Sequence, residues 1–119
     1  ITENLFGDIL TDEASVISGS MGLMPSASIG NENALYEPIH GSFPQATGLG
    51  IANPLATVLS AAMMFEMSFG MKEEGGLIRK AVDQSLADGK VTEDLAQQGS
   101  TPLSTSEVGD YLVKLINKE

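Results

Sequence analysis

Apolar residues recur at helical spacing in several segments of the chain, and glycine or proline separates these segments. A first helix is predicted over residues 8–18, and the glycine-rich run 19–25 ends it. A second, almost wholly apolar helix is predicted over residues 54–69. Asn53 is expected to be its N-cap, and Gly70 is expected to be the left-handed residue after its last turn.

Two more helices are predicted in the second half of the chain. Residues 76–88 place leucine, isoleucine, valine and alanine on one face, and Gly89 ends this helix. Ser104 and Glu107 have the spacing of a capping box, in which each side chain accepts a hydrogen bond from the other residue's backbone N–H. An amphipathic run that includes Val108 follows, so the last helix begins at this box.

Two short strands are predicted between the first and second helices. They cover residues 26–29 and 34–40, with turn residues at 30–33. Pro38 has no backbone N–H to donate, so it indicates an edge or irregular position. The predicted order is one helix, two short strands and three helices, with a glycine-rich loop over residues 41–52.

Composition and charge exclude several classes of protein. The chain has 119 residues, of which 42% are hydrophobic and 18% charged, as expected for a globular chain with one small core. Its net charge of −10 argues against a nucleic-acid partner or an anionic membrane surface, which both need clustered cations. The absence of cysteine excludes disulfides and thiolate metal sites. The apolar run 54–69 is too short to span a bilayer comfortably and contains Glu66.

Asp8 and Asp12 stand one turn apart on the first predicted helix, within about 40° of each other around its axis. Two carboxylates at this spacing repel each other unless a cation lies between them. Mg²⁺ or Mn²⁺ suits such a pair, because a hard cation takes one or two protein carboxylates and completes its shell with water and substrate oxygens. The alternative is a solvated helix start, where the helix dipole favours aspartate. Spacing alone does not separate these interpretations.

The glycine-rich loop is a second candidate site because it ends at a predicted helix N-terminus. Such loops let backbone N–H groups approach an anionic ligand closely. The residues Gly48, Gly50 and Asn53 nearly match a dinucleotide fingerprint, but the third glycine and the surrounding βαβ unit are missing, so that interpretation is rejected. A surface loop with turn glycines remains the alternative. His40, the chain's one histidine, precedes the loop; a lone histidine is more often structural than catalytic.

Several motifs of the chain resemble those of the isocitrate/isopropylmalate dehydrogenase family and occur in the same order as in the family. The first is Asn4-Leu5-Phe6-Gly7-Asp8-Ile9-Leu10-Thr11-Asp12, followed by Gly19-Ser20-Met21-Gly22-Leu23. The others are Glu37-Pro38-Ile39-His40-Gly41-Ser42, Gly50-Ile51-Ala52-Asn53-Pro54 and Leu59-Ser60-Ala61-Ala62-Met63-Met64. The motifs cover residues 2 to 70, and the later residues resemble the family only in helix pattern. Phe6-Gly7-Asp8-Ile9, and Ser42 after the histidine and glycine, are similar to the isopropylmalate branch.

The resemblance implies an α/β fold of which this chain is the C-terminal portion, consisting of helices and a few short strands. Residues 1–18 would end the smaller, dimer-forming domain, and residues 19–119 would belong to the larger, adenosine-binding domain. In the family, N-terminal strands complete the larger domain. We therefore expect that the chain alone leaves apolar faces uncovered, so that it associates or depends on the missing segment.

The resemblance also implies the cofactors. Asp8 and Asp12 would bind Mg²⁺ or Mn²⁺, and the loop would hold the adenosine half of NAD. The residues expected to bind NAD are His40, Gly41, Ser42, Phe43, Pro44, Gln45, Ala46, Thr47, Gly48, Leu49, Gly50, Ile51, Ala52 and Asn53.

The loop departs from the family pattern at Gln45, where members that use NAD generally place an acidic residue for the adenosine ribose. An amide oxygen is a weaker acceptor than a carboxylate. Phe43 and Thr47 also replace small or aliphatic residues. Relatives specific for NADP place lysine and tyrosine in this region; the loop has neither, and residues 1–71 contain no lysine or arginine. NAD is therefore the predicted coenzyme.

The reaction implied is oxidation of 3-isopropylmalate, or of a related 2-hydroxy dicarboxylate, followed by loss of CO₂. A cytoplasmic homodimer of leucine biosynthesis would catalyse it. The family's lysine, tyrosine and arginines lie upstream, so this chain is expected to hold no catalytic residue and to be inactive alone.

Substrate choice also depends on upstream residues, which leaves homoisocitrate, tartrate/malate and isocitrate dehydrogenases open as alternatives. A non-catalytic nucleotide-binding subunit is a further alternative, against which the retention of Asp8 and Asp12 argues.

Overall fold

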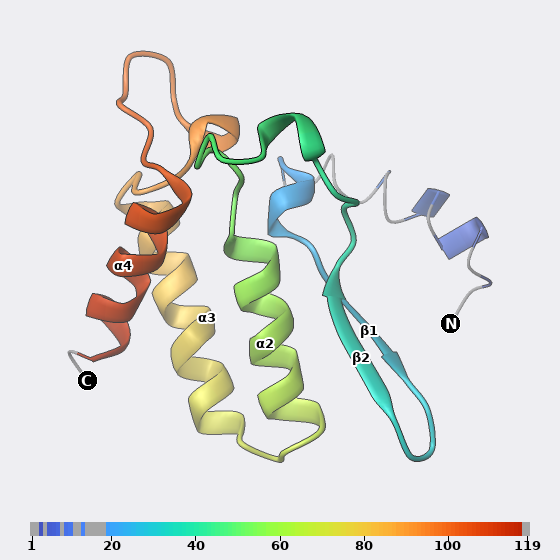
Figure 1. Ribbon diagram of the computed structural model, residues 1–119. Helices are drawn as coiled ribbons and strands as arrows, with labels where there is room; N and C mark the ends of the chain where they lie inside the picture. Colours follow the sequence, from blue (N-terminus) through green and yellow to red (C-terminus); the bar gives the residue numbers. More distant parts are fainter. Residues whose placement is uncertain (1–2, 4, 8, 11–12, 14–18, 118–119) are drawn as a thin grey trace.

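The structure is a computed structural model that describes residues 3, 5–7, 9–10, 13 and 19–117. A β-hairpin and three helices form its body, and short 3₁₀ helices lie in the connections (Figure 1). The elements in chain order are η1 (Met21–Leu23), β1 (Pro25–Ile29), β2 (Ala34–Pro38), η2 (Pro44–Ala46), α2 (Leu55–Met67), α3 (Lys72–Ala87), η3 (Glu93–Leu95) and α4 (Thr105–Ile116).

Helix α2 lies at the centre of this arrangement. The hairpin packs on one side of it and α3 on the other, while α4 packs on the far side of α3 (Figure 1). The two strands are antiparallel, with Pro25 opposite Pro38 and Ile29 opposite Ala34. A helix covered on two sides needs apolar residues around most of its circumference, which accounts for the almost continuous apolar sequence of α2.

The buried core lies where the three helices meet. It consists of Leu55 from α2, Ala81 and Val82 from α3, and Val108 and Leu112 from α4. The core draws on the amphipathic faces predicted for the last two helices. Leu55 is the first residue of α2, so the core includes the end of this helix that the glycine-rich loop reaches (Figure 1).

Close packing between α2 and α3 depends on Gly75. A Cβ atom at this position would collide with Cγ of Glu66 and would lie 3.0 Å from the carbonyl oxygen of Ala62. The Glu66 carboxylate is held by Arg79, whose Nε and Nη2 each donate a hydrogen bond of 2.8 Å. This hydrogen-bonded guanidinium keeps the pKa of Glu66 below its ordinary value, against a smaller opposing effect of burial.

Both predicted strands and their turn are confirmed, although their ends differ. The first strand begins at Pro25 rather than residue 26, and the second ends at Pro38 rather than residue 40. The capping box is confirmed, because Ser104 Oγ accepts from the backbone N–H of Glu107 and the Glu107 carboxylate accepts from the backbone N–H of Ser104.

The start of α2 differs from the prediction. The helix begins at Leu55, which makes Pro54 its N-cap instead of Asn53. Asn53 nevertheless performs part of the capping role, because its Oδ1 accepts a 2.9 Å hydrogen bond from the Leu55 N–H. At the other end Gly70 is left-handed as predicted, with φ of 67°.

Helix α3 begins four residues earlier than predicted. The predicted start at residue 76 followed the apolar residues of this segment, which begin at Leu77. Glu73 and Glu74 occupy the first turn instead, where the helix dipole favours acidic side chains. The apolar pattern therefore indicated a late start, because the first turn carries acidic residues and Gly75, which packs against Glu66, lies inside the helix.

The first predicted helix falls largely outside the described residues, which include its residues 9, 10 and 13 only. These three, together with residues 5–7, are helical. In the part of the chain that the structure describes, no helix is both long and apolar enough to cross a membrane.

Candidate functional site

The start of α4 holds the end of the glycine-rich loop in place. Thr105 donates its backbone N–H to the carbonyl oxygen of Gly50 over 2.7 Å and its hydroxyl to that of Ala52 over 2.6 Å. Gly48 and Gly50 have φ values of 80° and 66°, a conformation that other residues rarely adopt. The loop is therefore fixed to the helical body at its last residues.

Asn53 lies at the junction between this loop and α2. Its Oδ1 accepts from the Leu55 N–H, and its Nδ2 donates to Oδ2 of Asp94 over 2.9 Å. Both ends of the side-chain amide are thus engaged with partners that lie on different segments of the chain. The orientation of the amide follows from the chemistry of those partners.

Asp94, in η3, accepts hydrogen bonds from its neighbour Thr92 and from two segments that are distant in sequence. Its Oδ2 accepts from Ser20 Oγ over 2.7 Å as well as from Asn53, and its Oδ1 accepts from Thr92 Oγ1 over 2.5 Å. Asp94 is exposed, yet the partial desolvation of its carboxylate would by itself raise its pKa. The hydrogen bonds from Thr92, Asn53 and Ser20 outweigh this effect and hold the pKa below its ordinary value. The group is therefore an anion at neutral pH.

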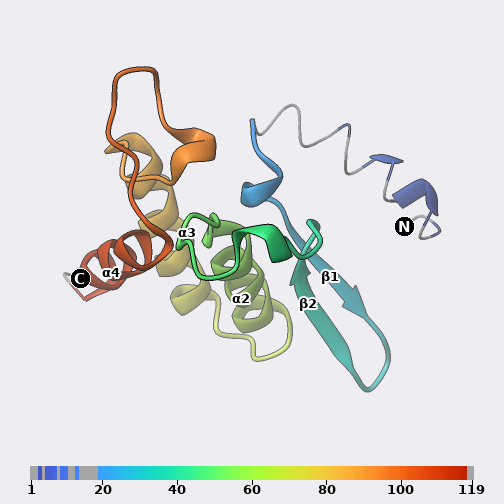
Figure 2. The same ribbon diagram turned by 45° about the horizontal axis from the view of Figure 1, so that its top comes forward.

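Figure 2, in which this end of the molecule is turned forward, shows η1, the loop and η3 around the same region. Ser20 is the N-cap of η1, and its Oγ also accepts from the backbone N–H of Gly22 over 3.0 Å. The hydrogen bond from Ser20 to Asp94 spans 74 residues of sequence. The turn that follows the predicted metal-binding helix is therefore tied to η3.

A pocket of about 360 Å³ opens between the loop and η3. Its lining residues are Phe43, Ile51, Ala52, Asn53, Glu93 and Asp94. The loop supplies apolar surface, whereas Asn53, Glu93 and Asp94 supply hydrogen-bonding groups. Such a combination suits a flat heteroaromatic group that carries hydrogen-bond donors, because the ring can lie on apolar atoms while its edge meets polar ones. Chemically, the pocket is suited to binding, and nothing in its composition makes it a reaction centre.

The structure brings together some of the predicted coenzyme residues. Phe43, Ile51, Ala52 and Asn53 line the pocket. Gln45 is exposed, Ala46 is buried, and the His40 ring lies 3.0 Å from the carbonyl oxygen of its neighbour Gly41 through Nδ1. Contact of any of these residues with NAD stays a prediction.

Both predicted metal ligands, Asp8 and Asp12, lie outside the described residues. Among the residues that are described, no group of three or more histidine, cysteine, aspartate or glutamate side chains gathers as a metal would require. The metal assignment therefore stays a prediction that rests on the sequence motif.

Thr92, Glu93 and Asp94 are the site residues that the sequence analysis missed. They lie between two predicted helices, in a segment with no apolar periodicity and no glycine-rich turn. Their partners Ser20 and Asn53 are 74 and 41 residues from Asp94. A contact over such a distance leaves no local pattern, although a threonine two residues before an aspartate is compatible with a local side-chain hydrogen bond.

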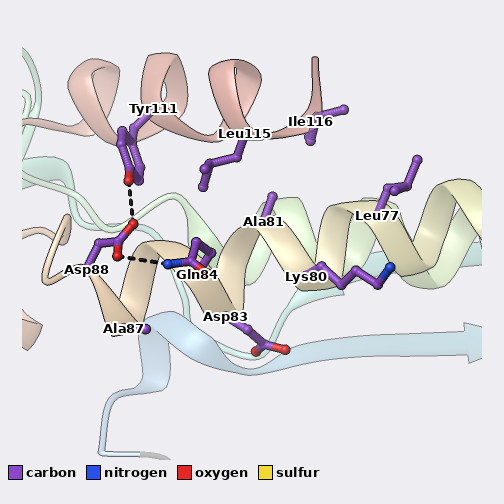
Figure 3. A pocket seen from close by; sticks show the side chains of 10 residues that line it. All are labelled: Leu77, Lys80, Ala81, Asp83, Gln84, Ala87, Asp88, Tyr111, Leu115 and Ile116. Carbon is purple, nitrogen blue, oxygen red and sulfur yellow. Dashed lines mark hydrogen bonds between the residues drawn. The ribbon is translucent and has the colours of Figure 1, made fainter. Parts of the chain in front are cut away.

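A larger groove of about 750 Å³ lies between α3 and α4 (Figure 3). At one end of the groove Asp88 accepts hydrogen bonds from Tyr111 over 2.5 Å and from Gln84 over 2.8 Å. The hydrogen bond to Asp88 raises the pKa of Tyr111 above its ordinary value. These polar groups satisfy one another, so the groove is a weaker candidate for a ligand site than the pocket beside the loop.

Comparisons with known proteins agree with the motifs. A family model described as isocitrate/isopropylmalate dehydrogenase matches residues 1–112. A 3-isopropylmalate dehydrogenase of Bacteroides fragilis is 59% identical over 118 residues, which cover 99% of this chain and 33% of that protein. The chain spans about a third of the length of such relatives.

Solved structures give the same result for the fold. The isocitrate dehydrogenase of Methylococcus capsulatus superposes with a TM-score of 0.88 at 39% identity, covering 95% of this chain and 33% of that one. A β-decarboxylating dehydrogenase of Thermococcus kodakarensis superposes with a TM-score of 0.83 at 41% identity, covering 97% of this chain and 32% of that one. The predicted α/β fold is confirmed.

Proposed function

Because the chain belongs to the isocitrate/isopropylmalate dehydrogenase family, we propose that it forms the C-terminal third of an NAD-dependent 3-isopropylmalate dehydrogenase, called the parent enzyme below. The observation that carries this proposal is the 59% identity to a 3-isopropylmalate dehydrogenase across 99% of the chain. The parent enzyme would oxidise the 2-hydroxy group of 3-isopropylmalate, pass hydride to NAD⁺ and release CO₂ in leucine biosynthesis.

The pocket beside the loop is the proposed site of the adenosine half of NAD. Phe43 and Ile51 would contact the ring, and Asn53 would face its polar edge. Glu93 and Asp94 give the pocket two carboxylates, and residues 1–71 contain no lysine or arginine. A 2′-phosphate would meet negative charge without a cation to compensate it, which supports NAD over NADP.

Asp8 and Asp12 are the proposed ligands of one Mg²⁺ or Mn²⁺ ion. Two carboxylates are a suitable donor set for a hard divalent cation, with water and substrate oxygens as further ligands. Such an ion, when bound, acidifies the substrate hydroxyl and stabilises negative charge on oxygen. Because two carboxylates alone rarely hold such an ion tightly, the site should also need substrate and a carboxylate from a second subunit.

We further propose that the parent enzyme is a cytoplasmic homodimer and that residues 1–18 belong to its dimer-forming domain. The support is a group of large apolar side chains that are mostly exposed in this chain: Leu5, Phe6, Ile9 and Leu10. Exposed apolar patches of this kind favour association. Residues 19–119 would then belong to the larger domain, and the chain alone would be inactive because it lacks the upstream catalytic residues.

Isocitrate is the main alternative substrate, because the solved isocitrate dehydrogenase of Methylococcus capsulatus superposes closely on the chain. Homoisocitrate and tartrate or malate are further alternatives, since the residues that would select among these acids lie upstream. A non-catalytic, nucleotide-binding subunit is also possible for this fold. The pair Asp8 and Asp12 argues against it, since such a subunit has no need of metal ligands.

The test is steady-state turnover of the parent enzyme with Mg²⁺ and each substrate: 3-isopropylmalate, isocitrate, homoisocitrate, tartrate and malate. Each substrate is offered with NAD⁺ and with NADP⁺ at equal concentration. The proposal predicts the highest kcat/KM for 3-isopropylmalate with NAD⁺. A higher kcat/KM for isocitrate would make isocitrate the substrate. Faster turnover with NADP⁺ would contradict the coenzyme assignment. Binding of NAD⁺ without turnover of any acid would indicate a non-catalytic subunit.

A further inference from the structure

We propose that Asp94 is a positioning residue for the coenzyme, acting through Asn53, whose side-chain amide it holds in one orientation at the pocket. This inference rests on the proposed function, because it concerns how the NAD pocket keeps its shape. It assigns a role to η3, a segment outside every motif of the sequence analysis.

The first argument comes from the chemistry of the two partners of Asn53. A side-chain amide can be turned by half a revolution, which exchanges its donor and acceptor ends. The Asp94 carboxylate can only accept, and the Leu55 N–H can only donate. Only one orientation satisfies both, so the pair fixes which way the amide faces. An Asn53 without Asp94 would lose the partner that specifies its donor end.

The second argument is that Asp94 is itself held firmly. Thr92, which is 1% exposed, donates to Oδ1, while Oδ2 is shared by Asn53 and Ser20. Hydrogen bonds to an ionised acceptor are shorter and stronger than those between neutral groups. The carboxylate therefore links η3 to two distant segments, and η3 lies at the same end of the molecule as the loop (Figure 2).

The third argument is the crowding around Asn53. The backbone of Gly22 approaches so closely that a Cβ atom there would lie 2.7 Å from Asn53 Nδ2. Asn53 is thus bounded by Gly22, by the start of α2 and by Asp94. Since Asn53 lines the pocket, a change in its orientation alters the surface that the coenzyme meets.

The experiment compares Asp94→Asn with Asp88→Asn in the parent enzyme. Asparagine replaces one of the two acceptor oxygens by an N–H donor and removes the charge, so the hydrogen bond to Asn53 loses its charge assistance. Asp94→Asn is expected to raise KM for NAD⁺ about tenfold, which corresponds to about 1.4 kcal/mol. KM for 3-isopropylmalate and kcat should change by less than about twofold, as fits a loss of uniform binding. Asp88→Asn removes the same charge from the groove between α3 and α4 and should leave both KM values unchanged.

A merely structural role would give a different pattern. It would lower Tm and the amount of folded enzyme while KM for NAD⁺ stayed at its original value, and that result would overturn the inference. If Asp94→Asn does not fold, Asp94→Glu replaces it, because this change keeps the charge and moves the carboxylate. A raised KM for NAD⁺ in that variant supports the role, and an unchanged KM contradicts it.

A double-mutant cycle separates positioning from direct contact. In an Asn53→Ala background, Asp94→Asn should raise KM for NAD⁺ by less than about twofold, because the residue it acts through is gone. A second, additive tenfold rise would show that Asp94 touches the coenzyme itself and would overturn the positioning role. A parent enzyme that binds no NAD⁺ would contradict the proposed function. An enzyme that binds NAD⁺ equally well with and without the Asp94 carboxylate would contradict this inference alone.

Discussion

Gly22 lies directly against Asn53: a Cβ atom built on Gly22 would be 2.7 Å from Asn53 Nδ2 and 2.9 Å from its Cβ and Cγ. Real Cβ atoms essentially never approach a neighbour so closely, so any side chain at this position must displace Asn53. The glycine belongs to the turn after the first predicted helix, and the asparagine directly follows the glycine-rich loop. The contact therefore joins this turn to the end of the loop.

Gly22→Ala is expected to weaken NAD⁺ binding in the parent enzyme. Overpacking typically costs about 1–3 kcal/mol, which corresponds to a rise in KM for NAD⁺ of about fivefold or more if the cost falls on the coenzyme-bound state. Gly109→Ala on α4 is the matched control, because a Cβ there meets no atom of the described residues within 4 Å. Equal KM values for NAD⁺ in the two variants would show that the Gly22 contact does not matter for the coenzyme.

The neighbouring glycines of α3 should respond in opposite ways to alanine. Gly75→Ala forces a Cβ into Glu66 and is expected to destabilise the parent enzyme by about 1–3 kcal/mol. Gly76→Ala meets no described atom within 4 Å and should stabilise it by about 0.5–1 kcal/mol through helix propensity. Thermal unfolding of both variants checks this, and a higher Tm for Gly75→Ala than for Gly76→Ala would contradict the packing described here.

Leu10→Asp is expected to convert the parent enzyme from dimer to monomer. Leu10 is 58% exposed in this chain, and a charge placed in a buried subunit interface carries a large desolvation cost. Val113→Asp on α4, where the side chain is 56% exposed, makes the same change at a site with no proposed interface role. Light scattering should show a monomer only for Leu10→Asp. If Leu10→Asp stays a dimer, the assignment of residues 1–18 to the subunit interface is wrong.

Gln45→Asp is expected to tighten NAD⁺ binding. A carboxylate accepts from the ribose hydroxyls more strongly than an amide oxygen, by about 1 kcal/mol, or about fivefold in Kd. Gln97→Asp adds the same charge to another exposed loop and serves as the control. Calorimetric titration measures both. A Kd for NAD⁺ that rises in Gln45→Asp would place Gln45 away from the ribose.

Asp12→Asn should raise the Mg²⁺ concentration needed for activity and lower turnover by orders of magnitude, because a neutral amide is a poorer ligand for a hard cation. Asp110→Asn, an exposed aspartate of α4, carries the same substitution away from the motif. Metal titration of turnover compares the two. If Asp12→Asn depends on Mg²⁺ in the same way as the unmodified enzyme, Asp12 is not a metal ligand.

Local sequence patterns predicted most of the fold. Apolar periodicity located α2, α3 and α4, and the box of Ser104 and Glu107 located the start of α4 to the residue. Such features depend on residues within one or two helical turns, so they can be read from a single sequence. The late predicted start of α3 shows the limit, since only the opposing Glu66 explains why Gly75 lies inside a helix.

The proposed coenzyme site was predicted only in part. The motif around Asn53 identified the loop, and in the structure Phe43, Ile51 and Asn53 line one pocket. Asp94 was missed because its partners lie far away in sequence and its own segment has no regular pattern. The opposite wall of a binding pocket is set by tertiary packing, which a local pattern does not encode.

These 119 residues are proposed to supply the coenzyme pocket and the metal-binding helix of a 3-isopropylmalate dehydrogenase. The most direct measurement is NADH formation by the Bacteroides fragilis 3-isopropylmalate dehydrogenase after its matching third has been replaced by this chain. The chimaera is predicted to turn over 3-isopropylmalate with NAD⁺ faster than with NADP⁺, and to lose this activity when a chelator removes Mg²⁺. A folded, dimeric chimaera that fails to bind NAD⁺ would contradict the claim.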